Sequence, residues 1–490
     1  MEINKGKNLF WYIQKYRHEM LIIVTIIIGI ILGMWQIAPV RVNSNSPYYS
    51  VFRQMISNVE RWSVPRPNGS VGIAWVREEI ITEIVEMGLT PIIQVVQYTR
   101  IENMEYILHN VGYTVDEWWE QNRDYMAQHN IYRPEDSFGR HIFGDNDYIY
   151  IYNILVALEC PNAQGGIMFV AHYDSWPGVA GASDNMVGVC ILLETIRTHT
   201  QNDSLANNLY FLFTDAHELG GGMGARQFVE NNPEFKDKLD LVIEVDGFQN
   251  WGIVLFDVTR SYNHARLFRN ATVKPIGFSV LPDIIHSRHH SGCHTAFLQS
   301  GYEAVAITAI GRRDIRHTSL DTIEKMSDAT AWHGLLSIMS IVDYFANNPL
   351  DEYGSTHIQA VYFPLMPYIL VVMRQSTSNI LGIIACILAL IYCFLQTKRK
   401  LFKFSVFNMI LIVAFLATVG SLLLIPSISY LIYIPLLAMS IMAFLEKWSH
   451  VYIVTRLVSI LAVILVWMPL LYLFFVIVLW HGLEPLPYIY

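Results

Sequence analysis

Five histidine, aspartate and glutamate residues of this chain are candidate metal ligands, and most of them lie just after a short apolar segment. His172 follows IMFVA, Glu218 lies shortly after LYFLF, and Asp246 follows LVIEV. Asp184 lies beyond a glycine-containing turn after His172, and His317 comes later, in RHTSLDT. Imidazole and carboxylate ligands together favour zinc, and three or four ligands per ion leave a position open for water. The set therefore predicts a catalytic divalent-metal site.

Asp174 has a different expected role, because it lies two positions after His172. Residues two apart on a strand point to the same face. The carboxylate can therefore hydrogen-bond the second imidazole nitrogen and orient the ring. Three competing motifs do not fit: Gly221 takes the second-histidine position of HExxH, the glycine run 220–224 lacks Gly-Lys-Ser/Thr, and no GxSxG is present.

The elements that must position these groups follow an α/β pattern, in which short apolar runs alternate with helical periodicity. In open α/β sheets, ligands bind outside the carboxyl ends of the strands, where these candidate side chains lie. We expect strands at 167–171, 209–213, 241–245 and 304–308, and helices at 71–87, 187–197, 225–229 and 327–347.

The composition indicates a membrane-embedded part. Only 15% of the 490 residues are charged and 53% are hydrophobic, whereas soluble domains carry roughly 25% charged residues. Residues 21–37 contain no charge and follow a basic segment, as expected of a transmembrane anchor. A cleaved signal peptide is the alternative, but no small-residue cleavage site follows closely. Further transmembrane α-helices are predicted at 379–394, 405–425, 427–445 and 454–480.

The charge distribution predicts how these spans are oriented. Residues 42–352 carry 21 Lys and Arg against 38 Asp and Glu, so we expect no nucleic-acid partner. The N-terminal basic residues, those at 398–403, and Lys447 with Arg456 fall on one side of the membrane. This orientation requires that segment 359–373, which two prolines interrupt, lies at the membrane interface and does not cross the membrane. The acidic middle then lies outside the cytoplasm.

The motifs around the candidate ligands resemble those of a known family. AHYDSWPGVAGASDNMVGVCILLE, FTDAHELGGGMGARQF, EVDG and RHTSLDT are similar, in order and spacing, to successive motifs of the co-catalytic di-zinc exopeptidases, metallopeptidase family twenty-eight. PRPNGS and the helix after it resemble that family's entry segment. The resemblance covers about residues 50–350 and implies a mixed, mostly parallel sheet flanked by helices. The membrane layout is similar to that of the endoplasmic-reticulum metallopeptidase branch.

The resemblance implies two zinc ions (Zn2+) per chain and a role for each ligand. His172 and Asp246 would hold one ion, Glu218 and His317 the other, and Asp184 would bridge the two. A bridging water would attack the scissile carbonyl of a peptide.

Two positions depart from the family pattern. The family places a glutamate, the general base, directly before the Glu218 position, where this chain has His217. Imidazole can shuttle a proton near neutral pH, so His217 either fills this role or marks a loss of activity. Some relatives carry a tyrosine as oxyanion donor before the last histidine ligand. Here Arg316 either binds an oxyanion or substrate carboxylate, or is solvated.

Two further regions carry open alternatives. The loop 284–296 has Cys293 where the family pattern SDH has aspartate, and it either forms a third metal site or lines the cleft as a polar loop; its histidines are His286, His289, His290 and His294. Residues 105–147 exceed the family's usual length and can cap the site. The five irregularly spaced cysteines are expected to be buried thiols, not a disulfide framework.

These observations predict a membrane-anchored zinc exopeptidase of the aminopeptidase type, with peptide substrates and membrane lipid as partners. The alternatives are a catalytically silent membrane binding protein and a one-zinc glutaminyl cyclase. We expect a multi-pass protein of the cell membrane, or of the endoplasmic-reticulum membrane with a lumenal domain; nothing specifies its oligomeric state. The expected organisation is a cytoplasmic N-terminus (1–20), an anchor (21–38), an extracytoplasmic zinc peptidase domain (39–355), an interfacial segment (356–375), a four-helix transmembrane region (376–480) and an extracytoplasmic tail (481–490).

Overall fold

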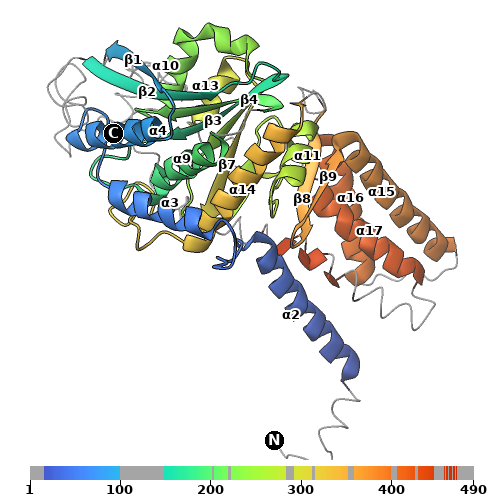
Figure 1. Ribbon diagram of the computed structural model, residues 1–490. Coiled ribbons are helices and arrows are strands. Elements are labelled where there is room, and N and C mark those ends of the chain that lie inside the picture. Colours follow the sequence, from blue (N-terminus) through green and yellow to red (C-terminus); the bar gives the residue numbers. More distant parts are fainter. Residues whose placement is uncertain are drawn as a thin grey trace, which may run out of the picture. The chain divides into compact units, whose positions relative to one another are not determined.

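The chain divides into two compact units, shown in the ribbon of the computed structural model (Figure 1). The sheet unit comprises residues 39–275 and 281–357, and the helical unit comprises described residues of 16–38, 276–280 and 358–475. The structure describes residues 16–99, 148–200, 204–218, 222–282, 292–311, 315–350, 358–398, 406–424 and 429–445, with isolated positions between 457 and 471.

A seven-stranded mixed sheet forms the centre of the sheet unit, in the order β1-β2-β4-β3-β5-β7-β6. The four strands β4, β3, β5 and β7 run parallel, while β1, β2 and β6 pair antiparallel at the two edges. This confirms the expected α/β fold class and all four expected strands. The strands are β1 (Ile92–Thr99), β2 (Tyr148–Leu158), β3 (Gly165–His172), β4 (Asn207–Thr214), β5 (Leu241–Val245), β6 (Asn250–Phe256) and β7 (Ala304–Gly311).

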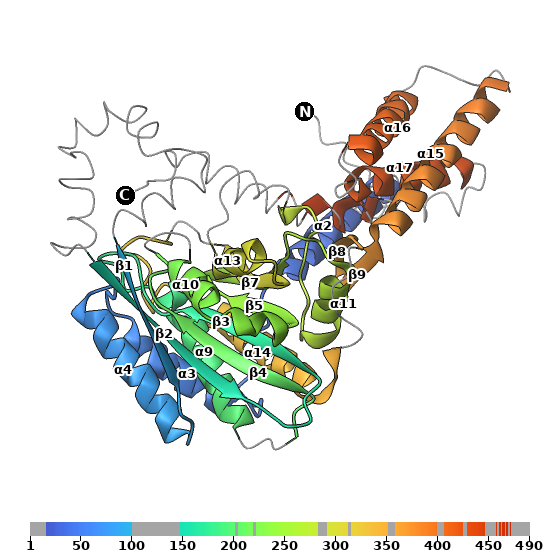
Figure 2. The same ribbon diagram turned by 90° about the horizontal axis from the view of Figure 1, so that it is seen from above.

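Helices cover both faces of this sheet, as Figures 1 and 2 show. On one face, α9 (Val187–His199) and α14 (Asp328–Asn347) pack against the central strands, with α3 (Tyr49–Trp62) and α4 (Val71–Glu86) against α9. On the other face lie α10 (Met223–Asn231) and α13 (Cys293–Gln299). The expected helices are confirmed. Ser70 and Ser327 cap α4 and α14 by accepting hydrogen bonds from Ile73 N and Thr330 N, which satisfies otherwise unpaired amide groups.

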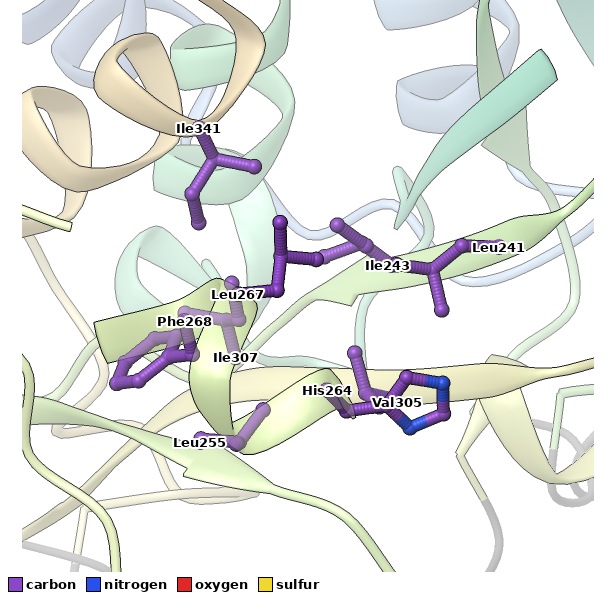
Figure 3. Close-up of a pocket in the computed structure, with 9 residues that line it drawn as sticks. All are labelled: Leu241, Ile243, Leu255, His264, Leu267, Phe268, Val305, Ile307 and Ile341. Atoms are coloured by element: carbon purple, nitrogen blue, oxygen red, sulfur yellow. The ribbon is translucent and has the colours of Figure 1, made fainter. Parts of the chain in front are cut away.

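A small apolar pocket lies beneath α11 (Tyr262–Ala271), between the sheet and α14 (Figure 3). Alternate residues of β5 and β7 point into it, because successive side chains of a strand face opposite sides. His264 of α11 is the polar member of its lining, which comprises Leu241, Ile243, Leu255, His264, Leu267, Phe268, Val305, Ile307 and Ile341.

The helical unit contains most of the segments predicted to span a membrane. They form α2 (Arg17–Ile37), α15 (Gln375–Lys398), α16 (Val406–Leu424) and α17 (Tyr430–Leu445). Within the described residues, Glu19–Ile37 and Gln375–Leu395 are long and apolar enough to cross a bilayer. The proline-interrupted segment forms an antiparallel hairpin of β8 (Ala360–Met366) and β9 (Ile369–Arg374). Most of the expected span 454–480, the tail 481–490 and the expected cap 105–147 lie outside the described residues.

Candidate metal centre

The parallel pairing of β3 with β5 brings the first two candidate ligands together. His172 is the last residue of β3 and Asp246 directly follows β5. Because the carboxyl ends of parallel strands meet at the same edge of a sheet, the two side chains face each other. His172 Nε2 lies 3.2 Å from Asp246 Oδ1, and the imidazole is fully buried.

Asp184 lies between this pair and the remaining ligands. It lies in the turn Ala182–Met186, which Asp321 holds: Ser183 N and Oγ donate to Asp321 Oδ1, and Asp184 N donates to Asp321 Oδ2 at 3.1 Å. Asp184 Oδ1 is 3.5 Å from His172 Nε2, and Asp184 Oδ2 is 3.3 Å from His317 Nε2. One carboxylate thus reaches both histidines.

Glu218 and His317 form the second pair, with Glu218 Oε2 3.0 Å from His317 Nε2. The His317 ring is stacked on Trp176, with centroids 4.6 Å apart and planes 10° apart. His317 has a positive φ of 58°, a backbone conformation that few non-glycine residues adopt and that frequently marks functional positions.

Asp174 makes the hydrogen bond expected from its spacing. Its Oδ1 lies 3.2 Å from His172 Nδ1, and its Oδ2 accepts a hydrogen bond from Glu218 N at 2.9 Å. Burial raises the pKa of Asp174, but the contact with His172 outweighs burial and lowers it. The ionised carboxylate therefore fixes Nδ1 and leaves His172 Nε2 as the nitrogen available to a metal.

The donor set fits a divalent cation. Among the described residues, Asp184 Oδ1 and Glu218 Oε1 are buried and have no hydrogen-bond partner. Ligand atoms of His172, Asp184 and Glu218 lie within 4.8 Å of one another. Burial lowers the pKa of His172 and His317, but their carboxylate neighbours outweigh it, raising His172 well above its usual value and His317 to about 9. Buried carboxylates such as those of Asp174 and Asp184 destabilise the fold unless positive charge lies beside them, and a divalent cation would supply that charge.

Comparison with known proteins identifies the region that carries this site. Residues 153–342 match the model of peptidase family M28. We refer to these matched residues as the M28 domain. All five candidate ligands lie within the matched residues.

Curated membrane proteases are also similar to this chain. The vacuolar membrane protease of Eremothecium gossypii is 28% identical over 307 residues, covering 60% of this chain and 29% of that protein. The vacuolar membrane protease of Saccharomyces cerevisiae is 27% identical over 238 residues, covering 48% and 24% respectively. The chain therefore spans less than a third of the length of these relatives. Among solved structures, an aminopeptidase from Aneurinibacillus sp. strain AM-1 is similar with a TM-score of 0.46 and 13% identity, covering 61% of this chain and 94% of that one.

Both departures from the family motif lie at the metal centre of the M28 domain. Arg316 Nε donates to Asp184 Oδ2 at 2.8 Å, and Arg316 Nη2 is 3.8 Å from Asp246 Oδ2. His217 is buried, with its ring stacked on that of His172. The histidines expected at 286, 289 and 290 lie outside the described residues, whereas His294 is buried beside Glu244.

Three functional supports of the M28 domain are absent from the sequence prediction: Asp321, Glu244 and Arg66. Asp321 lies in the quoted motif RHTSLDT and Arg66 in PRPNGS, but no role followed from either motif alone. The Arg66 guanidinium is fully buried and donates to four carbonyl groups, those of Val64, Tyr173, Ala180 and Gly181. It thereby fixes the loop that connects His172 to Asp184. Glu244 accepts hydrogen bonds from Cys293 N and His294 N.

Proposed function

We propose that this chain is a membrane-anchored, zinc-dependent exopeptidase of the aminopeptidase type that hydrolyses peptides outside the cytoplasm. The observation that carries the proposal is the position of Asp184 between the pair His172–Asp246 and the pair Glu218–His317. A carboxylate with one oxygen directed to each pair suits two cations that share one ligand.

In this proposal His172 and Asp246 would hold one zinc ion, Glu218 and His317 would hold the other, and Asp184 would be a ligand of both. Zinc bound there would lower the pKa of a water molecule and polarise the scissile carbonyl group. Asp174 keeps His172 Nε2 directed to the site, and Asp321 keeps Asp184 in place through the hydrogen bonds to its turn. Both act by fixing ligand geometry before substrate arrives.

His217 and Arg316 have different roles in this proposal: His217 transfers a proton, and Arg316 binds negative charge. His217 accepts a proton from the attacking water and then gives it to the leaving amine nitrogen, as general base and acid. Arg316 presents a cation beside Asp184 and is partly exposed, at 27% of its side chain. A guanidinium in that position can also bind the carbonyl oxygen as it becomes negative, or a substrate carboxylate.

The membrane attachment rests on the helical unit and the distribution of charge. α2 and α15 expose apolar side chains such as Ile27, Ile31, Ile387 and Leu390, which is costly in water and favourable in lipid. The basic residues that flank the spans favour a cytoplasmic position, so the acidic M28 domain is proposed to lie on the opposite side. The relatives named as vacuolar membrane proteases are consistent with a membrane-attached peptidase.

The test is the metal content and hydrolytic activity of the full chain purified in detergent. Wild-type protein is expected to bind about two zinc ions and to hydrolyse N-terminal aminoacyl reporters. Asp184→Ala is expected to lose both properties, because it removes the shared ligand. Asp343→Ala is the matched control, since that exposed carboxylate pairs with His199 on a remote surface. Two bound zinc ions without hydrolysis of any reporter would overturn the exopeptidase proposal.

One observation favours a second candidate, a catalytically silent binding protein. The Arg316 guanidinium already bonds to Asp184 and supplies positive charge that a metal ion would otherwise supply. Wild-type protein with no bound zinc and no activity would support this candidate. A single zinc ion together with cyclisation of N-terminal glutamine would instead support a glutaminyl cyclase.

A further inference from the structure

Two of the three positions at which this chain departs from the family motifs, His217 and Cys293, contact each other. His217 stands where the family pattern has glutamate, and Cys293 stands where the pattern SDH has aspartate. The residues are 76 positions apart, yet His217 Nδ1 lies 3.2 Å from Cys293 Sγ. Both side chains are buried, with 4% and 0% of their surface exposed. His217 and Cys293 therefore form a buried contact next to the candidate ligand His172.

Cys293 is held in place by groups that are themselves buried. Cys293 N, at the start of α13, donates to Glu244 Oε1 at 2.6 Å. Cys293 Sγ also lies 3.4 Å from Thr214 Oγ1, at the end of β4. The backbone of Cys293 is thus held by β5, and its sulfur is held by β4.

The electrostatic surroundings keep the sulfur as a thiol. Burial raises the pKa of Cys293, and the nearby Glu244 carboxylate raises it further. A neutral thiol can accept a weak hydrogen bond. This contact favours the ring orientation in which Nδ1 of His217, and not a ring carbon, faces the sulfur. With Nδ1 held at the thiol, the nitrogen left for a water molecule is Nε2.

We propose that Cys293 is a positioning residue that fixes the ring of His217, so that an imidazole–thiol pair replaces a carboxylate pair. The role in catalysis rests on the proposed function. Nδ1 carries the ring hydrogen and donates it to Cys293 Sγ, so water gives its proton to the unprotonated Nε2 of His217. Nε2 then gives that proton to the amine nitrogen of the leaving group, which restores the starting imidazole.

The same residues offer an alternative, a third metal site formed by His217, Glu244 and Cys293, whose ligand atoms lie within 4.8 Å of one another. The hydrogen bonds of Glu244 argue against it. Its carboxylate already accepts from Cys293 N and His294 N and contacts His294 Nδ1. Both oxygens of Glu244 are therefore already engaged by buried donors, with which a metal ion would have to compete.

The first experiment measures the contact without turnover. The tautomer of His217 is read from the NMR shifts of its ring nitrogens, which are assigned by comparison of wild-type protein with His217→Phe. In wild-type protein Nδ1 is expected to carry the hydrogen, and in Cys293→Ala, which removes its acceptor, the ring is expected to shift toward the tautomer with the hydrogen on Nε2. A tautomer that is unchanged in Cys293→Ala would overturn the proposal. A changed tautomer in a protein that hydrolyses no reporter would support the fixed ring and would overturn only the proposed peptidase function.

The second experiment is a double-mutant cycle on hydrolysis of an aminoacyl reporter. Cys293→Ala is expected to lower kcat by about 10- to 100-fold with little change in KM, whereas Cys293→Ser retains most of the activity. In a His217→Ala background, Cys293→Ala should have no further effect, because the thiol acts through the imidazole. Cys190→Ala, which removes another fully buried thiol, should leave kcat unchanged.

Two results would overturn the role of Cys293. Equal losses from Cys293→Ala in the wild-type and His217→Ala backgrounds would show that the thiol acts by packing alone. A thiolate-to-cobalt charge-transfer band in the cobalt-substituted protein, lost in Cys293→Ser, would show that the sulfur is a metal ligand.

Discussion

The imidazole rings of His172 and His217 lie face to face, with centroids 4.0 Å apart and planes 9° apart. One of these rings is the proposed zinc ligand, and the other is the proposed general base. Two stacked imidazolium ions would repel each other, so a neutral, metal-bound His172 leaves His217 free to carry the proton during a reaction cycle. Under the proposed function, the stack would couple the protonation of His217 to a metal ion bound by His172.

Replacement of His217 separates its chemical role from its packing role. His217→Phe keeps a ring against His172 but cannot transfer a proton. We expect its kcat to fall by about 10²- to 10⁴-fold with zinc content unchanged. Enzyme assays and metal analysis on the same preparation check this. An activity within a few-fold of wild type would move the base to another residue.

Replacement of Arg316 tests the charge at Asp184. Arg316→Met removes a cation 2.8 Å from Asp184 Oδ2, so zinc should bind about tenfold more tightly, because a like charge no longer opposes the ion. Turnover should fall, since the donor to the developing oxyanion is lost. Zinc titration against a competing chelator measures the first effect. Arg316→Lys keeps the charge and is the control; weaker zinc binding in Arg316→Met would show that the guanidinium chiefly holds Asp184 in place.

Replacement of Arg66 tests the loop between two ligands. Arg66→Met leaves the carbonyls of Tyr173 and Gly181 without their buried donor, and we expect a loss of at least about 3 kcal/mol in unfolding free energy. Zinc content should fall as well, because this loop leads to Asp184. Thermal unfolding and metal analysis check both effects. Arg61→Met, at an exposed ion pair with Glu79, should change stability by under about 1 kcal/mol.

The sequence predicted the central part of the fold because buried parallel strands are continuous apolar runs, as in Phe169 and its neighbours on β3. It also predicted which residues would meet, because the carboxyl ends of such strands share one edge. The strands β1, β2 and β6 were not predicted. In β1 and β2, polar residues such as Gln94 and Asn153 interrupt the apolar pattern and hydrogen-bond to each other only once the strands pair.

The supports of the site could not be predicted for a different reason. Asp321 holds Ser183 from 138 positions away, and Cys293 meets His217 from 76 positions away. Such contacts depend on the paths of α13 and of the segment that follows β7, which no local pattern specifies. The hairpin of β8 and β9 likewise depends on Pro367 and Tyr368 at its turn, where Tyr368 has a positive φ of 68°.

A pH dependence of stability is expected from the buried pair Asp257 and His264, whose ring also approaches Glu303. Burial lowers the pKa of His264, but the contact with Asp257 has the larger effect and raises that pKa above 6.5. Burial raises the pKa of Asp257, but the contact with His264 has the larger effect and lowers that pKa below 3.8. A raised folded-state pKa gives stability that is fully present below pH 6.5 and is lost as pH rises through the folded value. The difference in Tm between wild type and His264→Gln should therefore be larger at pH 6 than at higher pH.

The control for this prediction lies in the same pocket (Figure 3). Leu267→Ala removes apolar packing beside His264 and should cost about 2–5 kcal/mol at every pH. A His264→Gln deficit that is equally independent of pH would show that the imidazole acts there only by filling space.

The position of Arg66 determines where the chain can be cut to make a shorter fragment. The match to the M28 family begins at residue 153, but the side chain that satisfies the carbonyls of Tyr173, Ala180 and Gly181 comes from a segment almost ninety positions earlier in the chain. A recombinant fragment cut at the family boundaries would contain every proposed zinc ligand and still lack the group that shapes the loop between two of them. The smallest active fragment should therefore begin before Pro65, ahead of both α4 and the sheet.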